Sequence, residues 1–216
     1  MSESSIIASA QSPTEHPDRS PAASLFVWLV IQLLALAVGV CRAPLAARVV
    51  QPEQFSLHVM LVTQIIASAM LFPLILRDVT TAAMAILAIA PFVQLASYLS
   101  EIPLQSAALA GAYVAMWMLA LTMWKSILRT PRGEMLGIAC AIALSIGGAI
   151  VWYVRAEELK GGQTDWSIDA LFGPILGVIA QLHAPMSAAL IAWAWPVVIL
   201  VTCAIARVTM RASRDR

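Results

Sequence analysis

The sequence contains very little charge. Asp, Glu, Lys and Arg make up only 12% of its 216 residues, whereas about a quarter of a soluble domain is charged. From Ala22 to Leu76 the only charged residues are Arg42, Arg48 and Glu53. This scarcity excludes an ordinary soluble domain. The net charge of +1, without a basic stripe, also makes nucleic acid a poor candidate partner.

The sequence also lacks the motifs of common enzyme classes and of folds held together by disulfides or structural metal ions. The three cysteines, Cys41, Cys140 and Cys203, are isolated, and an odd number without CxxC spacing does not predict a disulfide framework or a zinc knuckle. The sequence has no HExxH, GxSxG or GxxxxGK[ST] pattern, which are the marks of zinc hydrolysis, a nucleophile elbow and nucleotide binding. These three chemistries therefore lack support in the sequence, and a non-enzymatic function is favoured while the question of an enzyme stays open.

What the sequence does contain is a series of apolar runs near 20 residues long. At 1.5 Å per residue, a helix of this length crosses the ~30 Å hydrocarbon core of a bilayer. Lipid also forces each segment to satisfy its own backbone hydrogen bonds, which favours helices. We predict an all-α polytopic transmembrane bundle occupying residues 22–208, with six spans at 22–41, 57–76, 80–99, 102–124, 134–154 and 186–208.

Three other segments do not read as spans. Residues 1–21 are rich in Ser and Pro, which predicts a disordered tail, and residues 209–216 form a short basic tail. The run 168–184 is apolar, but Gly173-Pro174 interrupts it and Pro185 ends it. It is too short to cross the bilayer, so a re-entrant or interfacial segment before the last span is expected.

The distribution of Lys and Arg predicts the orientation. The heaviest clusters are at Lys125, Arg129 and Arg132 and in the C-terminal tail, and such clusters remain on the cytoplasmic side. An even number of crossings must separate them, so 168–184 returns to the outer face. Both termini are then cytoplasmic. The short Ala- and Leu-rich spans favour a bacterial inner membrane.

One face of the fifth predicted span carries small residues every four positions. They are Gly137, Ala141, Ser145 and Ala149. Small side chains at this spacing allow helix backbones to approach closely, so this face is predicted to pack against neighbouring helices.

Polar residues in the third span suggest a solute path. Pro91 is expected to bend this span. Polar residues follow Pro91 along one face of the span, and Gln64 in the second span adds another polar side chain. These groups can either line a path or form hydrogen bonds with a neighbouring helix. These candidate path residues are Gln94, Ser97, Tyr98, Glu101 and Gln64.

Imidazole and thioether groups form a second candidate site. His58 and Met60 begin the second span, and His183 and Met186 precede the last one. Cys41 ends the first span, and the predicted topology places all five residues near the outer interface. Imidazole with thioether suits Cu(I), and a facing histidine pair suits a b-type haem, so both copper and haem are kept as possible cofactors.

The pattern of six spans, internal termini and a re-entrant segment before the last span resembles the membrane half of ABC-2-type exporters. That resemblance covers the span pattern only. It implies a permease-like subunit that works with a separate cytosolic ATPase, although the link at Arg77-Asp78-Val79 has no room for the coupling helix of that family. Two alternatives remain: a structural or assembly subunit among other membrane subunits, and a haem- or copper-handling protein.

Overall fold

The computed structural model describes residues 21–41, 54–75, 79–128, 130–154, 171 and 173–212. The predicted tails, the basic residue Arg129 and the first part of segment 168–184 therefore lie outside the described residues, or mostly so. The described chain is all helical, with six helices or helix pairs long and apolar enough to cross a membrane and one shorter apolar helix before the last. The prediction of a six-span membrane bundle is confirmed.

The elements follow the predicted spans closely. Spans three, five and six are each built from consecutive shorter helices. In chain order the elements are α1 (Pro21–Cys41), α2 (Phe55–Ile75), α3 (Val79–Leu87), α4 (Ile89–Leu99), α5 (Leu104–Ile127), α6 (Pro131–Ile142), the π-helix η2 (Ala143–Gly147), α7 (Gly148–Val154), α9 (Pro174–His183), α10 (Met186–Ala192) and α11 (Ala194–Ala212).

Prolines explain two of the breaks inside spans. The third span is interrupted at Ala88, three residues before Pro91, and the last span at Trp193, three residues before Pro196. A proline has no N–H to bond to the carbonyl four residues earlier, and its ring collides with that carbonyl. The bond from Ala88 N–H to Met84 O, at 2.9 Å, still joins α3 to α4. The helix is thus interrupted just before Pro91, where a bend was expected, and just before Pro196.

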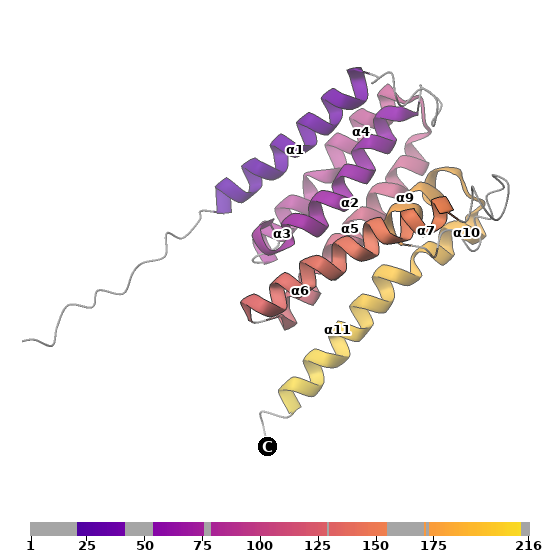
Figure 1. The fold of residues 1–216 in the computed structure, drawn as a ribbon. Helices are drawn as coiled ribbons and strands as arrows, with labels where there is room; N and C mark the ends of the chain where they lie inside the picture. Colours follow the sequence, from indigo (N-terminus) through magenta and orange to yellow (C-terminus); the bar gives the residue numbers. More distant parts are fainter. Residues whose placement is uncertain are drawn as a thin grey trace, which may run out of the picture.

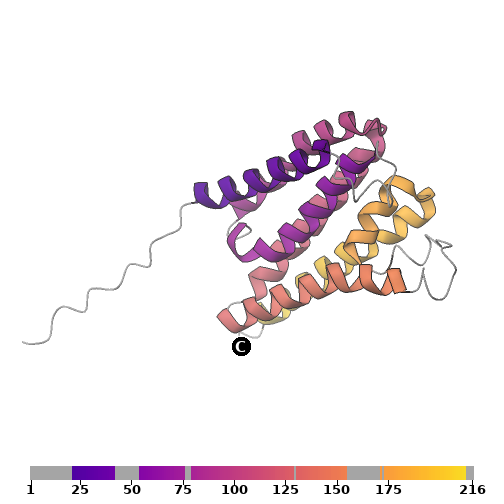
Figure 2. The same ribbon diagram turned by 45° about the horizontal axis from the view of Figure 1, so that its top comes forward.

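The helices form one bundle with two distinct ends. Both described ends of the chain, at the start of α1 and the end of α11, lie at the same end of the bundle (Figures 1 and 2). The turn between α4 and α5 lies at the other end, beside the start of α2, where the Ser100 hydroxyl accepts a hydrogen bond from Leu57 N–H at 3.0 Å. We call this second end the histidine end, because His58 and His183 lie there.

The α6–η2–α7 span packs through one face. Gly137, Ala141 and Ser145 are buried and Ala149 is partly buried. A β-carbon at Gly137 would lie 3.1 Å from Phe72 Cζ, so α6 and α2 approach closely at this point. Ala139 and Ala143, on the other side of the span, are exposed.

Candidate functional site

The two histidines of the described chain meet at the histidine end. His58 is in the first turn of α2 and is almost fully buried, whereas His183 is the last residue of α9 and is exposed. Their Nε2 atoms lie 2.7 Å apart. The contact joins two residues that are 125 positions apart in the sequence.

The two imidazole rings face each other edge to edge. Their planes differ by 13° and their centroids are 4.9 Å apart. The centroids are farther apart than the two Nε2 atoms, which are separated by 2.7 Å. The difference is about twice the distance from a ring nitrogen to the centre of its ring. The rings therefore lie nearly in one plane with their Nε2 atoms directed at each other.

The hydrogen bonds fix the tautomers of the neutral pair. His58 Nδ1 lies 2.7 Å from Gln54 O, and a carbonyl only accepts, so this nitrogen carries the hydrogen. His58 Nε2 is then the bare acceptor, and His183 Nε2 donates to it. Partial burial, with the neighbouring charge of His58 as a smaller cause, lowers the pKa of His183 below its ordinary value of 6.5.

Helix α9 starts inside the bundle and ends at this pair. At its start, Gly173 has φ 141°, and a β-carbon there would lie 2.6 Å from Leu144 O and 3.7 Å from Gly148 Cα. Both the left-handed backbone and the close approach require glycine. Leu144 and Gly148 are in the interior of their span, so α9 runs from within the bundle to the histidine end without crossing it.

Aromatic residues and one amide hold α9 in place. Trp193 packs edge-on against Tyr113, with ring centroids 5.5 Å apart, and donates from Nε1 to Gln181 Oε1 at 3.3 Å. Gln181 in turn donates to Ala189 O at 2.8 Å. At the start of the segment, Trp195 Nε1 donates to Leu171 O at 2.6 Å. The last span therefore anchors both ends of the re-entrant segment.

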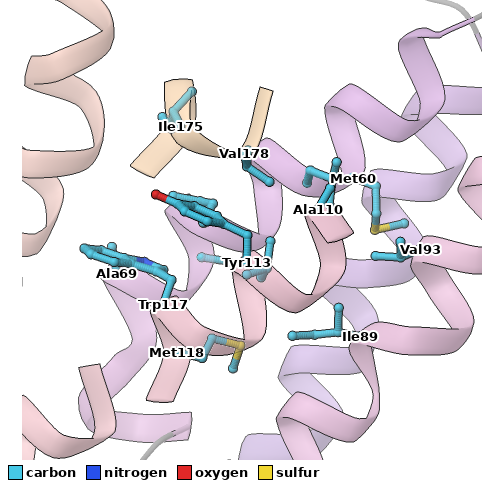
Figure 3. Close-up of a cluster of buried hydrophobic side chains, with 14 of the residues drawn as sticks. Met60, Ala69, Ile89, Val93, Ala110, Tyr113, Trp117, Met118, Ile175 and Val178 are labelled. Carbon is cyan, nitrogen blue, oxygen red and sulfur yellow. The ribbon is translucent and has the colours of Figure 1, made fainter. Parts of the chain in front are cut away.

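Unpaired polar atoms are buried beside α9. Figure 3 shows Tyr113 and Trp117 extending from α5, with the Tyr113 hydroxyl directed towards the α9 segment that carries Ile175 and Val178. Neither side chain has any exposed surface, and Ser145 on η2 is 1% exposed. Within the described chain, the buried side-chain atoms without a hydrogen-bond partner are Tyr113 Oη, Trp117 Nε1, Ser145 Oγ, Gln32 Nε2 and Gln64 Oε1.

Two of these five atoms, Gln32 Nε2 and Gln64 Oε1, belong to an amide pair between α1 and α2. Gln64 Nε2 donates to Gln32 Oε1 at 2.7 Å, and both side chains are completely buried. The contact leaves one donor and one acceptor of the pair without a partner. Gln64, predicted as a path residue, thus meets another span rather than the rest of the predicted stripe.

The stripe on α4 is distributed over different environments. Ser97 is buried and donates to Ile102 O at 2.9 Å, which closes the end of α4. Gln94, Tyr98 and Glu101 are exposed, Tyr98 to 82%. Gln94 lines a groove of ≈ 370 Å³ between α3–α4 and α5, whose other lining residues are mostly Ala, Ile and Val.

The two methionines predicted to accompany the histidines are placed differently from them. Met60 is fully buried in the apolar core, and Met186 is 62% exposed at the start of α10. The described residues contain no group of three or more His, Cys, Asp or Glu positioned to hold a metal ion. The structure therefore brings together the two imidazoles of the predicted set. Tyr113 and Trp117 were not singled out in the sequence, although two polar aromatics four residues apart mark one face of α5.

Comparison with known proteins gives no relative: no family model, no curated protein and no solved structure matches the chain significantly.

Proposed function

We propose that this chain is a permease-like subunit of a transport system, in which the re-entrant helix α9 and the spans around it form the solute path. One observation carries the proposal: Tyr113 Oη and Trp117 Nε1, on the α5 face that packs against α9, and Ser145 Oγ on η2 are buried without partners. Water or a polar solute in the path supplies those partners.

The energetic argument is direct. A buried polar atom without a hydrogen bond costs about 1–3 kcal/mol, so such atoms usually meet ordered water, a ligand or another group. Non-helical backbone at membrane depth is tolerated where it is buried in protein or lines a water-filled cavity. The start of α9 at Gly173 is backbone of this kind.

The geometry of α9 and η2 also fits transport proteins in general. Many transporters build their solute sites from half-helices that end within the membrane, and α9, with ten residues, is such a half-helix. Single-turn π-helices are frequent at functional sites, and η2 places Ser145 close to the α9 start through its neighbour Leu144. A path along α9 would open at the histidine end.

A cysteine-accessibility experiment tests this path. In a background in which Cys41, Cys140 and Cys203 are replaced by Ala, Ser145→Cys should react with a small hydrophilic thiol reagent in native membranes. The matched control is Ile146→Cys at the adjacent position. The native Ile146 side chain is 38% exposed on the outside of the bundle, where it faces lipid, which a hydrophilic reagent does not enter. Reaction at 145 but not at 146 is the expected result. A folded Ser145→Cys variant that does not react would contradict a water-filled path.

The groove between α4 and α5 favours a second candidate function, that of an assembly subunit. Its α5 wall consists of Leu104 and four small residues, Ala108, Gly111, Ala112 and Ala115. Small residues at this spacing let another helix approach closely. A stable multi-subunit membrane complex after mild solubilisation, without an ATPase, would support this candidate. Co-purification of a stoichiometric ATPase would support the permease subunit.

The proposed location is a bacterial inner membrane, with both termini in the cytoplasm. Lys125 and Arg132 lie at the opposite end of the bundle from the histidines, as do the described chain ends. An ATPase would have to bind at this basic end. It cannot use a coupling helix between α2 and α3, because only three residues, 76–78, separate them. A reporter fused after residue 165 should score external, and a cytoplasmic score would reverse the orientation.

A further inference from the structure

We infer that His58 and His183 together bind a divalent transition-metal ion of the zinc–copper group at the histidine end of the bundle. The inference is independent of the solute path, because it depends on the contact between α2 and α9 alone.

The two imidazoles are arranged as a ligand pair. Their Nε2 atoms are directed at each other in nearly one plane. His58 donates from Nδ1 to the carbonyl of Gln54. Metal-binding histidines almost always donate their second ring N–H in this way, and the bond fixes the tautomer and the ring orientation. The lone pair of His58 Nε2 is therefore already directed at the site.

His183 becomes the second ligand by a change of tautomer. In the neutral pair its Nε2 carries the hydrogen that is shared with His58. When the ion binds, that proton moves through solvent to Nδ1 of the same ring, and Nε2 supplies its lone pair to the metal. No net proton is released, and both Nε2 atoms bind the ion instead of sharing a hydrogen. Because His183 is exposed, both the ion and the water that carries the proton can reach it.

The movement that metal binding requires can be confined to the His183 side chain. Two nitrogen ligands at the Zn–N distance of about 2.0–2.1 Å, with tetrahedral geometry, lie roughly 3.4 Å apart, compared with 2.7 Å between the two Nε2 atoms here. His183 is the last residue of α9, and the next residue, Ala184, is extended. A rotation of the exposed His183 side chain would increase this distance and turn its Nε2 lone pair away from the line between the two nitrogens, towards the ion.

The chemistry of the ligands selects the ion. Imidazole suits Zn²⁺ and Cu²⁺, whereas Ca²⁺ and Mg²⁺ require oxygen ligands. With no group of three His, Cys, Asp or Glu within the described part of the chain, water completes the coordination. Met60 lies in the core, so the thioether set that would favour Cu(I) is not assembled. A haem does not fit either, because its macrocycle would have to lie between α2 and α9, which are in contact.

Electron paramagnetic resonance of bound Cu²⁺ tests the inference directly. The full chain would be purified through a tag that lacks histidine and treated with a chelator. We expect one Cu²⁺ per chain, with hyperfine splitting from two imidazole nitrogens. Zn²⁺ should compete with it and raise the thermal unfolding temperature by linking the two helices.

Three variants provide the controls. H183A should weaken Zn²⁺ binding by about tenfold or more, the scale of effect that even outer-shell partners have at metal sites. H16A removes the only other histidine of the chain and should change nothing. H183Q keeps a hydrogen-bond donor for His58, so loss of the two-nitrogen signal with unchanged unfolding of the metal-free protein separates binding from folding. Unaltered Cu²⁺ binding in H183A, or a signal that disappears in H16A, would overturn the inference.

Discussion

Tyr113 on α5 packs directly against the backbone of Gly177 on α9. A β-carbon at position 177 would collide with the tyrosine hydroxyl and lie 2.7 Å from its Cζ. The tyrosine ring is completely buried, so the side chains packed around it limit how far it can move. This contact sets how closely the re-entrant helix approaches the bundle core.

Gly177→Ala should therefore destabilise the protein by about 1–3 kcal/mol, the usual cost of overpacking a rigid core. Thermal unfolding in detergent would measure this change. The matched control is Gly147→Ala, since a β-carbon at 147 meets nothing within 4 Å. Alanine should be neutral there, or stabilising by up to about 1 kcal/mol, because it favours helical backbone. Equal effects at both positions would show that the Tyr113 contact is not what restricts position 177.

The six spans could be predicted because hydropathy and length alone identify them. The sequence also predicts that His58 and His183 lie at the same end of the bundle, because an even number of crossings between the basic clusters places both histidines near one interface. Their direct contact was not accessible. Hydropathy gives the depth of a residue in the membrane, but not its position around the bundle, and this contact depends on the close packing of α9 against α2.

The polar residues at the end of the third span show again that the sequence does not determine which way a helix face is directed. The spacing of Gln94, Tyr98 and Glu101 predicts one helix face, but only Gln94 and Tyr98 lie on α4, whereas Glu101 follows the end of that helix with a φ of 52°. Periodicity does not determine whether that face meets the bundle or its surroundings, and all three are exposed. The buried polar side chains of α5, Tyr113 and Trp117, lie in a span whose apolar composition conceals them.

Tyr113→Phe distinguishes a hydrated interior from a dry one, because its effect on the free energy of unfolding should have opposite signs in the two cases. If water in the path bonds to Tyr113 Oη, removal of the hydroxyl should cost about 0.5–1.5 kcal/mol, the net value of one hydrogen bond. In a dry bundle the same substitution removes an unpaired buried group and stabilises the protein. Chemical or thermal unfolding in detergent would measure the difference. A stabilised Tyr113→Phe variant would argue against the proposed solute path.

Ser100 caps a helix that is distant from it in sequence. Its hydroxyl accepts the hydrogen bond of Leu57 N–H at 3.0 Å, and Leu57 is in the first turn of α2, where backbone donors have no partner within the helix. Ser100→Ala should cost about 0.5–2 kcal/mol, as loss of a capping side chain does. Ser100→Thr retains the hydroxyl and serves as the control. An Ala variant as stable as the parent would show that water replaces the cap.

The histidine pair should make stability depend on pH in the metal-free protein. The pKa of His183 is lowered in the folded state from 6.5, first by burial and then by the charge of His58, so the unfolded chain binds its proton more readily. Stability is then greatest above pH 6.5 and decreases as the pH falls below that value, until the folded state is protonated too. Two protonated rings also cannot share the Nε2–Nε2 hydrogen bond.

Thermal unfolding between about pH 8 and about pH 5, with a chelator present, would measure this dependence. His183→Gln is the informative variant, because its amide still donates to His58 Nε2 but does not titrate. The part of the pH dependence that belongs to His183 should disappear in this variant, while stability at the alkaline end changes little. His16→Ala controls for the third histidine and should follow the parent. If His183→Gln retains the full loss of stability at low pH, other groups cause it, and the histidine contact is not the acid-sensitive point between α2 and α9.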